Sequence, residues 1–178
     1  MENNKNKGIT LKFLSYGIFI FSVFILQNTP HFLEFWGIKP NIIYVVAVVL
    51  AMFEGEFSGG ILGMIIGMLC DYSSYPIHGF NAMLLLICCT MIGLAVIYFM
   101  KNNKLNAFTF SAIALSLRGF LEYYFVYVIW KYENTSIILF KHIIPTIIYS
   151  LLFVIPIFFV ISKIHKYFNE KYNLEQEI

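Results

Sequence analysis

Arg118 and Glu122 are the ionisable residues whose types and spacing most invite a chemical interpretation. They lie four residues apart in an otherwise apolar stretch, so on a helix they share one face. Charged groups at membrane depth are costly and usually face the bundle interior or a wet cavity. We predict an intramembrane ion pair that fixes helix packing. A solute pathway and a protein contact within the membrane remain as alternatives.

The other reactive residue types form no pattern typical of catalysis. The histidines lack partners at metal-ligand spacing, the serines lack a nucleophile-elbow context, and the sequence contains no Walker loop. The three cysteines lie in apolar segments and fit neither a disulfide framework nor a zinc site; they are Cys70, Cys88 and Cys89. We therefore expect no enzyme activity, no metal and no cofactor.

Composition indicates an integral membrane protein. The chain has 178 residues, of which 60% are hydrophobic and only 12% are charged, whereas a soluble domain carries about 25% charged residues. The net charge of +2, without lysines and arginines interleaved with aromatic residues, excludes a nucleic-acid-binding protein. The sequence predicts a single polytopic membrane domain over residues 1–178.

A row of glycines precedes the chain's aspartate. Gly55, Gly59, Gly63, Gly67 and Asp71 are each four residues apart, so on a helix they form a groove without side chains that ends in one carboxylate. In lipid, small residues at this spacing let a second backbone approach closely. We predict that this row serves helix packing, or contact with a partner protein, and that Asp71 marks the exit from the hydrocarbon.

The apolar runs that position these residues predict an all-α bundle of about six transmembrane helices. Pro30 ends the first helix and Pro40 opens the second, while Gly79 breaks a loop and Asn81 caps the helix that follows. Whether the second and third helices cross fully or form a re-entrant hairpin stays open, because both are short. The expected helices cover about residues 13–28, 40–53, 55–71, 80–100, 106–130 and 137–162.

Charge distribution sets the expected orientation. With six crossings, eight lysines fall on one side and three on the other, so the positive-inside rule puts both termini in the cytoplasm of a bacterial plasma membrane. The cytoplasmic tails would then be residues 1–12 and 163–178. Glu54 and Glu56 would face the cytoplasm, and the loop from Asp71 to Gly79 would face outward.

The order of these features resembles the MreD family, the rod shape-determining membrane proteins. The resemblance runs along most of the chain. It rests on Leu26-Gln27 with Pro30, on Pro40-Asn41, on the glycines before Asp71, on Gly79 with Asn81, and on Pro156 before Lys163 and Lys166. The loop between Asp71 and Gly79 departs from the family, and Arg118 and Glu122 match no family motif.

The resemblance implies a non-enzymatic scaffold needed for rod cell shape, which positions lateral peptidoglycan synthesis. Its implied partners are an MreC-like protein, MreB-like filaments, and a RodA-type glycosyltransferase with its transpeptidase. It also implies a fold similar to the substrate-binding subunits of energy-coupling-factor transporters. The alternative function is therefore a vitamin- or solute-binding transporter subunit, with an outer site built from Tyr72, Tyr75 and His78.

Overall fold

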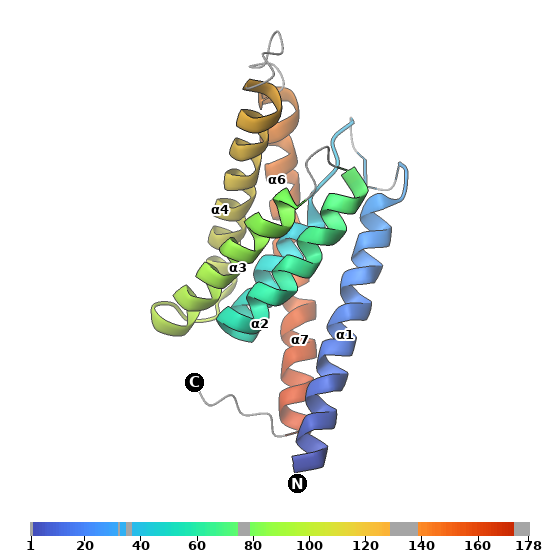
Figure 1. The fold of residues 1–178 in the computed structure, drawn as a ribbon, viewed down its shortest axis with the longest axis vertical. Helices are drawn as coiled ribbons and strands as arrows, with labels where there is room; N and C mark the ends of the chain where they lie inside the picture. The colour runs from blue at the N-terminus through green and yellow to red at the C-terminus, as the bar shows by residue number, and fades with distance from the viewer. Residues whose placement is uncertain (1, 32, 35–36, 75–78, 129–138, 173–178) are drawn as a thin grey trace.

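The computed structural model describes residues 2–31, 33–34, 37–74, 79–128 and 139–172. The elements of the described residues are all helical. Most of the helices follow the long axis of the molecule, and the two that begin at Ile42 and Phe80 run obliquely to it (Figure 1). In chain order the elements are α1 (Glu2–Asn28), α2 (Ile42–Ser74), α3 (Phe80–Tyr98), α4 (Lys104–Glu122), the π-helical turns η1 (Tyr123–Val128) and η2 (Leu139–Ile143), α6 (Ile144–Leu152) and α7 (Val154–Tyr172).

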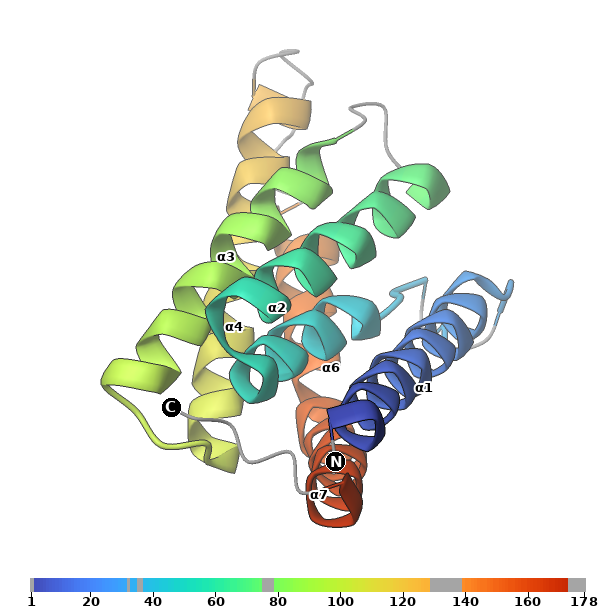
Figure 2. The same ribbon diagram turned by 60° about the horizontal axis from the view of Figure 1, so that its bottom comes forward.

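Helix α2 reverses direction at Gly55. This residue has φ 77° and ψ −170°, a backbone conformation that glycine adopts without the cost of a Cβ. The two halves of α2 lie against each other (Figure 2), and a Cβ added at Gly59 would lie 2.7 Å from the Cα of Ala51. The boundary between the expected helices 40–53 and 55–71 is therefore the tip of a tight helical hairpin. Gly55 was expected as the first member of the helical glycine row, but it lies at the turn itself.

The first half of α2 forms the centre of the bundle. Every residue from Ile42 to Met52 is buried, so this short helix is covered by protein on all sides. A helix that is apolar all round belongs in such a position. The core thus surrounds the first half of α2, while the glycine row lies on the second half.

Helices α1 and α7 lie side by side and extend together at one end of the molecule (Figure 1). A Cβ added at Gly8 would lie 2.6 Å from the Cγ atom of Tyr172, so the beginning of α1 touches the end of α7. Between α6 and α7 the axis bends by 42°. Pro156 explains this bend, because it cannot donate a hydrogen bond to the carbonyl of Leu152, with which its ring would clash in a straight helix.

Several helix boundaries differ from those expected. Residues 1–12 were expected as a tail, but α1 begins at Glu2, so the polar start of the chain is part of the first helix. Lys12 lies within this helix and is buried. Residues 163–172, expected as the helical beginning of a tail, continue α7. The regular fifth helix ends at Glu122 and continues as the π-helical turn η1; the expected ends at Trp130 and Ile137 lie outside the described residues.

Three of the described helices are long and apolar enough to cross a membrane, and a fourth span results if the bent pair of α6 and α7 is taken as one. The three are within α1, α2 and α3. The chain is therefore a helical membrane protein with three to four candidate spans. Six crossings and a likeness to transporter subunits remain predictions from the sequence.

Candidate functional site

The glycine row is enclosed within this chain. A Cβ at Gly63 would lie 2.7 Å from the sulfur of Cys89, and one at Gly67 would lie 2.4 Å from the Cα of Ala82. Both neighbours belong to α3, so the second half of α2 crosses α3 with backbones nearly in contact. Gly59 instead faces the first half of α2. The row therefore divides its contacts between two neighbours inside the protein.

Asp71 caps the beginning of α3. Its Oδ2 atom accepts hydrogen bonds from the backbone N–H groups of Gly79 and Ala82, both at 3.1 Å, and its Oδ1 atom accepts from the backbone and side-chain nitrogens of Asn81 at 3.0 and 2.9 Å. These donors include N–H groups of the first helical turn, which have no partner within the helix. Asp71 is buried, although the sequence indicated that it would mark the exit from the hydrocarbon.

A polar network continues from Asn81 across the bundle. The Oδ1 atom of Asn81 accepts hydrogen bonds from the hydroxyl of Tyr44 and, at 3.3 Å, from Nε of Arg118. The guanidinium carbon of Arg118 lies 4.8 Å from the centre of the Tyr44 ring, within the range of a cation–π contact. The expected pair of Arg118 and Glu122 has an N–O distance of 3.4 Å, with side chains 11% and 21% exposed. This outer network, made of Asp71, Asn81, Tyr44, Arg118 and Glu122, joins α2, α3 and α4.

A second buried network surrounds Glu54 at the tip of the α2 hairpin. Its carboxylate lies 2.7 Å from Nζ of Lys12 and accepts a hydrogen bond of 2.8 Å from the hydroxyl of Tyr16. Nδ1 of His165 lies 2.9 Å from the same carboxylate. The side chains of Lys12 and Glu54 are only 5% and 4% exposed. This tip network, made of Glu54, Lys12, Tyr16 and His165, joins the hairpin to α1 and α7.

Asn169 supports His165 one helical turn further along α7. Its side-chain nitrogen lies 3.0 Å from Nε2 of His165. Nδ1 of the imidazole thus faces Glu54 and Nε2 faces the side-chain amide of Asn169, so both ring nitrogens have a polar partner. The ring also packs against Phe53, with centroids 5.1 Å apart. Contacts on both nitrogens and on one face hold the imidazole in place.

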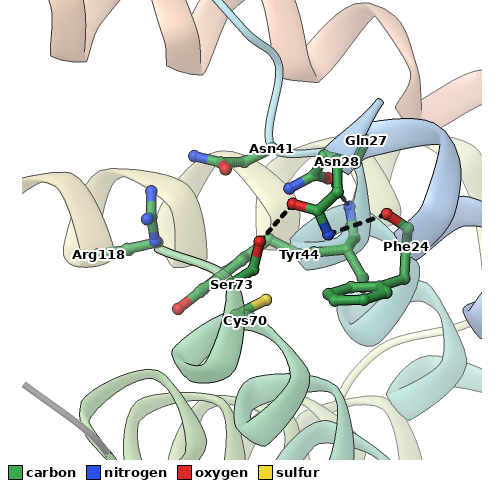
Figure 3. Close-up of a pocket in the computed structure, with 9 residues that line it drawn as sticks. Phe24, Gln27, Asn28, Asn41, Tyr44, Cys70, Ser73 and Arg118 are labelled. Carbon is green, nitrogen blue, oxygen red and sulfur yellow. Dashed lines mark hydrogen bonds between the residues drawn. The ribbon is translucent and has the colours of Figure 1, made fainter. Parts of the chain in front are cut away.

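A small polar cavity lies beside the outer network (Figure 3). It encloses about 30 Å³, a volume that holds ordered water and is far below that of a ligand pocket. Around it, Gln27 accepts a hydrogen bond from the backbone N–H of Ile43 at 3.0 Å, and Asn28 accepts one from Ser73. These bonds tie the end of α1 to both halves of α2.

The outer solute site of the alternative function receives no support from the described residues. Tyr72 is 87% exposed, and Tyr75 and His78 lie outside the described residues. Within the described part of the chain, no group of three or more His, Cys, Asp or Glu side chains is placed to hold a metal ion.

Sequence reasoning missed the tip network. Lys12 and His165 were assigned to the two tails, and Tyr16 was not considered. The bonds that join them to Glu54 connect residues 38 to 111 positions apart, so no local spacing reveals them. One signal was present: the expected topology puts Lys12, Glu54 and His165 at the same end of the bundle.

The comparisons with known proteins agree with the resemblance found in the sequence. The family model described as rod shape-determining protein MreD matches residues 7–168 of the chain. The match spans both polar networks and the crossing of α2 and α3. No curated protein and no solved structure matches the chain.

Proposed function

The chain belongs to the MreD family of rod shape-determining membrane proteins, and from this premise we propose that it is a non-enzymatic scaffold of the cell-elongation machinery. In this role it would hold other membrane proteins together and thereby position lateral peptidoglycan synthesis. The proposed orientation has both termini in the cytoplasm, so that the tip network lies toward the cytoplasm and the outer network toward the outside.

One observation supports a scaffold most directly: two pairs of buried or largely buried charged groups bind within the bundle. Glu54 contacts Lys12, and Arg118 contacts Glu122 and Asn81. Such interlocked groups stabilise one arrangement of helices. A transporter subunit would instead direct polar groups into an enclosed solute cavity, and the cavity beside Arg118 has a volume of only about 30 Å³.

The proposed partners are an MreC-like protein and MreB-like filaments, which together with MreD form one shape-determining system. A RodA-type glycosyltransferase and its transpeptidase are proposed as further members of the same assembly. Exposed apolar side chains on the outer helices offer contact area to membrane partners; examples are Phe57, Met83 and Phe120.

Depletion in the native cells tests the proposal. We expect rod-shaped cells to become spherical as the protein is lost, and the tagged protein to co-purify with an MreC-like protein from gently solubilised membranes. Re-expression of the wild-type chain should restore rods. If depleted cells keep their shape but lose uptake of a vitamin, the scaffold proposal is wrong and the transporter alternative holds.

A further inference from the structure

An apolar groove runs between α1 and the second half of α2. It has a volume of about 400 Å³ and is lined on one wall by Phe13, Gly17, Ile20 and Phe21, and on the other by residues from Phe57 to Leu69. The second wall spans residues 57–69, whose ends are twelve helical steps apart, or about 18 Å at 1.5 Å per residue. The groove is therefore long enough to hold several turns of a helix.

Small residues lie on both walls of this groove. No heavy atom lies within 4 Å of a Cβ added at Gly17, and Ser58 lies on the opposite wall. Small side chains let the backbone of a second helix approach the wall of the groove closely. They offer no comparable advantage to a lipid acyl chain. The shape of the groove thus favours a transmembrane helix over lipid.

At the hairpin tip the groove opens into a polar recess. Phe57 and Ser58 line both, and the recess has a volume of about 610 Å³. Glu56 lines it, and the Oε2 atom of Glu56 is buried without a hydrogen-bond partner among the described residues. The neighbouring Glu54, by contrast, has three partners from α1 and α7. An unpaired buried carboxylate oxygen is costly. Glu56 as a whole is only part-buried and lines the recess, so a cation that enters the recess would pair with its carboxylate and offset this cost.

We propose that the groove and recess together form the docking site for a single transmembrane helix of a partner protein, with a lysine or arginine at its cytoplasmic flank that pairs with Glu56. This inference rests on the proposed scaffold function and names the surface that carries it. The positive-inside rule supplies the cation, because membrane helices carry lysine and arginine on their cytoplasmic side. The recess lies at the same end as Lys12 and the tip network, which is the proposed cytoplasmic end.

Photo-cross-linking in the native cells tests where the partner lies. Benzoylphenylalanine replaces Phe57 in the groove or, as a matched control, Phe120, an exposed phenylalanine of α4 outside it. We expect the probe at position 57 to cross-link to the transmembrane helix of one single-pass protein, near a basic residue identified by mass spectrometry. The probe at position 120 should not reach that protein. Cross-links from position 57 to lipid alone, to a second copy of this chain or to a soluble protein would overturn the inference.

Binding measurements with the purified full-length chain and the cross-linked partner test the chemistry. Glu56→Gln keeps the shape and removes the charge, and we expect it to weaken binding by about tenfold, as for the loss of one charge pair at an interface. Glu170→Gln is the control, because this exposed carboxylate lies on α7. Exchanging the partner's basic residue for glutamate should weaken binding more than Glu56→Gln does, because two carboxylates then repel each other, and combining it with Glu56→Lys should restore affinity. Equal affinity of the Glu56→Gln variant and the wild type would contradict the pairing.

Gly17→Leu separates this inference from the scaffold proposal. No heavy atom of the chain lies within 4 Å of a Cβ at this position, so the variant should fold normally. The leucine side chain would occupy the groove, so the cross-link from position 57 should be lost. If this variant is folded, keeps the cross-link and supports rod growth, the groove is not the docking site. The scaffold function would still stand if depletion turns rods into spheres.

Discussion

The ammonium of Lys12 lies 2.7 Å from the carboxylate of Glu54, although the two residues are 42 positions apart in the chain. Both side chains are almost completely buried. Water cannot solvate either charge at such a buried position, so the attraction between the two charges has to offset the cost of burying both. The pair therefore fixes the position of α1 against the α2 hairpin, and it gives the first prediction.

Lys12→Met should destabilise the protein strongly, because it leaves the Glu54 carboxylate buried without its cation. We expect a loss of about 3–5 kcal/mol, the usual effect of breaking a buried ion pair, measured as a lower Tm in detergent micelles. The double variant Lys12→Met with Glu54→Gln should recover part of that loss. Lys7→Met is the control, since Lys7 is exposed. Equal melting temperatures for the Lys12 variant and the wild type would contradict the prediction.

Asp71→Ala should loosen the beginning of α3. The change removes the acceptor of four hydrogen bonds, and we expect a loss of about 2 kcal/mol, the upper range for a helix cap. Hydrogen exchange followed by mass spectrometry should show faster exchange in the peptide containing Gly79 to Ala82. Tyr72→Ala, at the neighbouring exposed residue, should leave that peptide unchanged. Unchanged exchange in the Asp71 variant would show that these bonds do not hold the turn.

Gly67→Ala should disturb the crossing of α2 and α3, because the added methyl group would lie 2.4 Å from the Cα of Ala82. The two backbones must separate, and overpacking of this kind costs about 1–3 kcal/mol. Gly17→Ala is a matched control within a helix, since its methyl group meets nothing within 4 Å; it should stabilise the helix by up to about 1 kcal/mol. Thermal unfolding of the two variants in the same detergent compares them. A Gly67 variant as stable as the wild type would rule out close contact at this crossing.

Arg118→Ala should weaken the outer network at two points. It leaves Glu122 without its cation and removes the hydrogen bond that Nε of Arg118 donates to Asn81. We expect a loss of about 3 kcal/mol, the lower end of the range for a broken buried pair, because Glu122 is 21% exposed and water screens part of its charge. Arg118→Lys should recover little, since an ammonium lacks the planar geometry that stacks on Tyr44. A lysine variant with wild-type stability would show that charge alone matters here.

The parts of the fold that follow from local chemistry were predictable. Apolar runs indicated the helices, and the boundary between the expected helices 40–53 and 55–71 indicated the break between the halves of α2. The spacing of Gly63 and Gly67 indicated a close crossing. The i,i+4 spacing of Arg118 and Glu122 indicated the pair seen at 3.4 Å. Each of these signals lies within a few turns of one helix.

The other features of the fold and the site could not be predicted from the sequence, because they depend on which helices pack against each other. An unbroken apolar run such as Ile42 to Met52 reads alike whether lipid or protein surrounds it, so the central position of this short helix could not be predicted. The role of Asp71 as a cap depends on the path of the chain back to Asn81. The four residues of the tip network come from three elements, and only the packing of α1 and α7 against the hairpin brings them together.

The tip network also constrains how the protein is made. Glu54 leaves the ribosome early, but His165 follows 111 residues later. Until α7 has been synthesised and inserted, the carboxylate has Lys12 and Tyr16 but lacks His165, one of its three partners. A product truncated before α7 therefore leaves the buried Glu54 carboxylate one partner short.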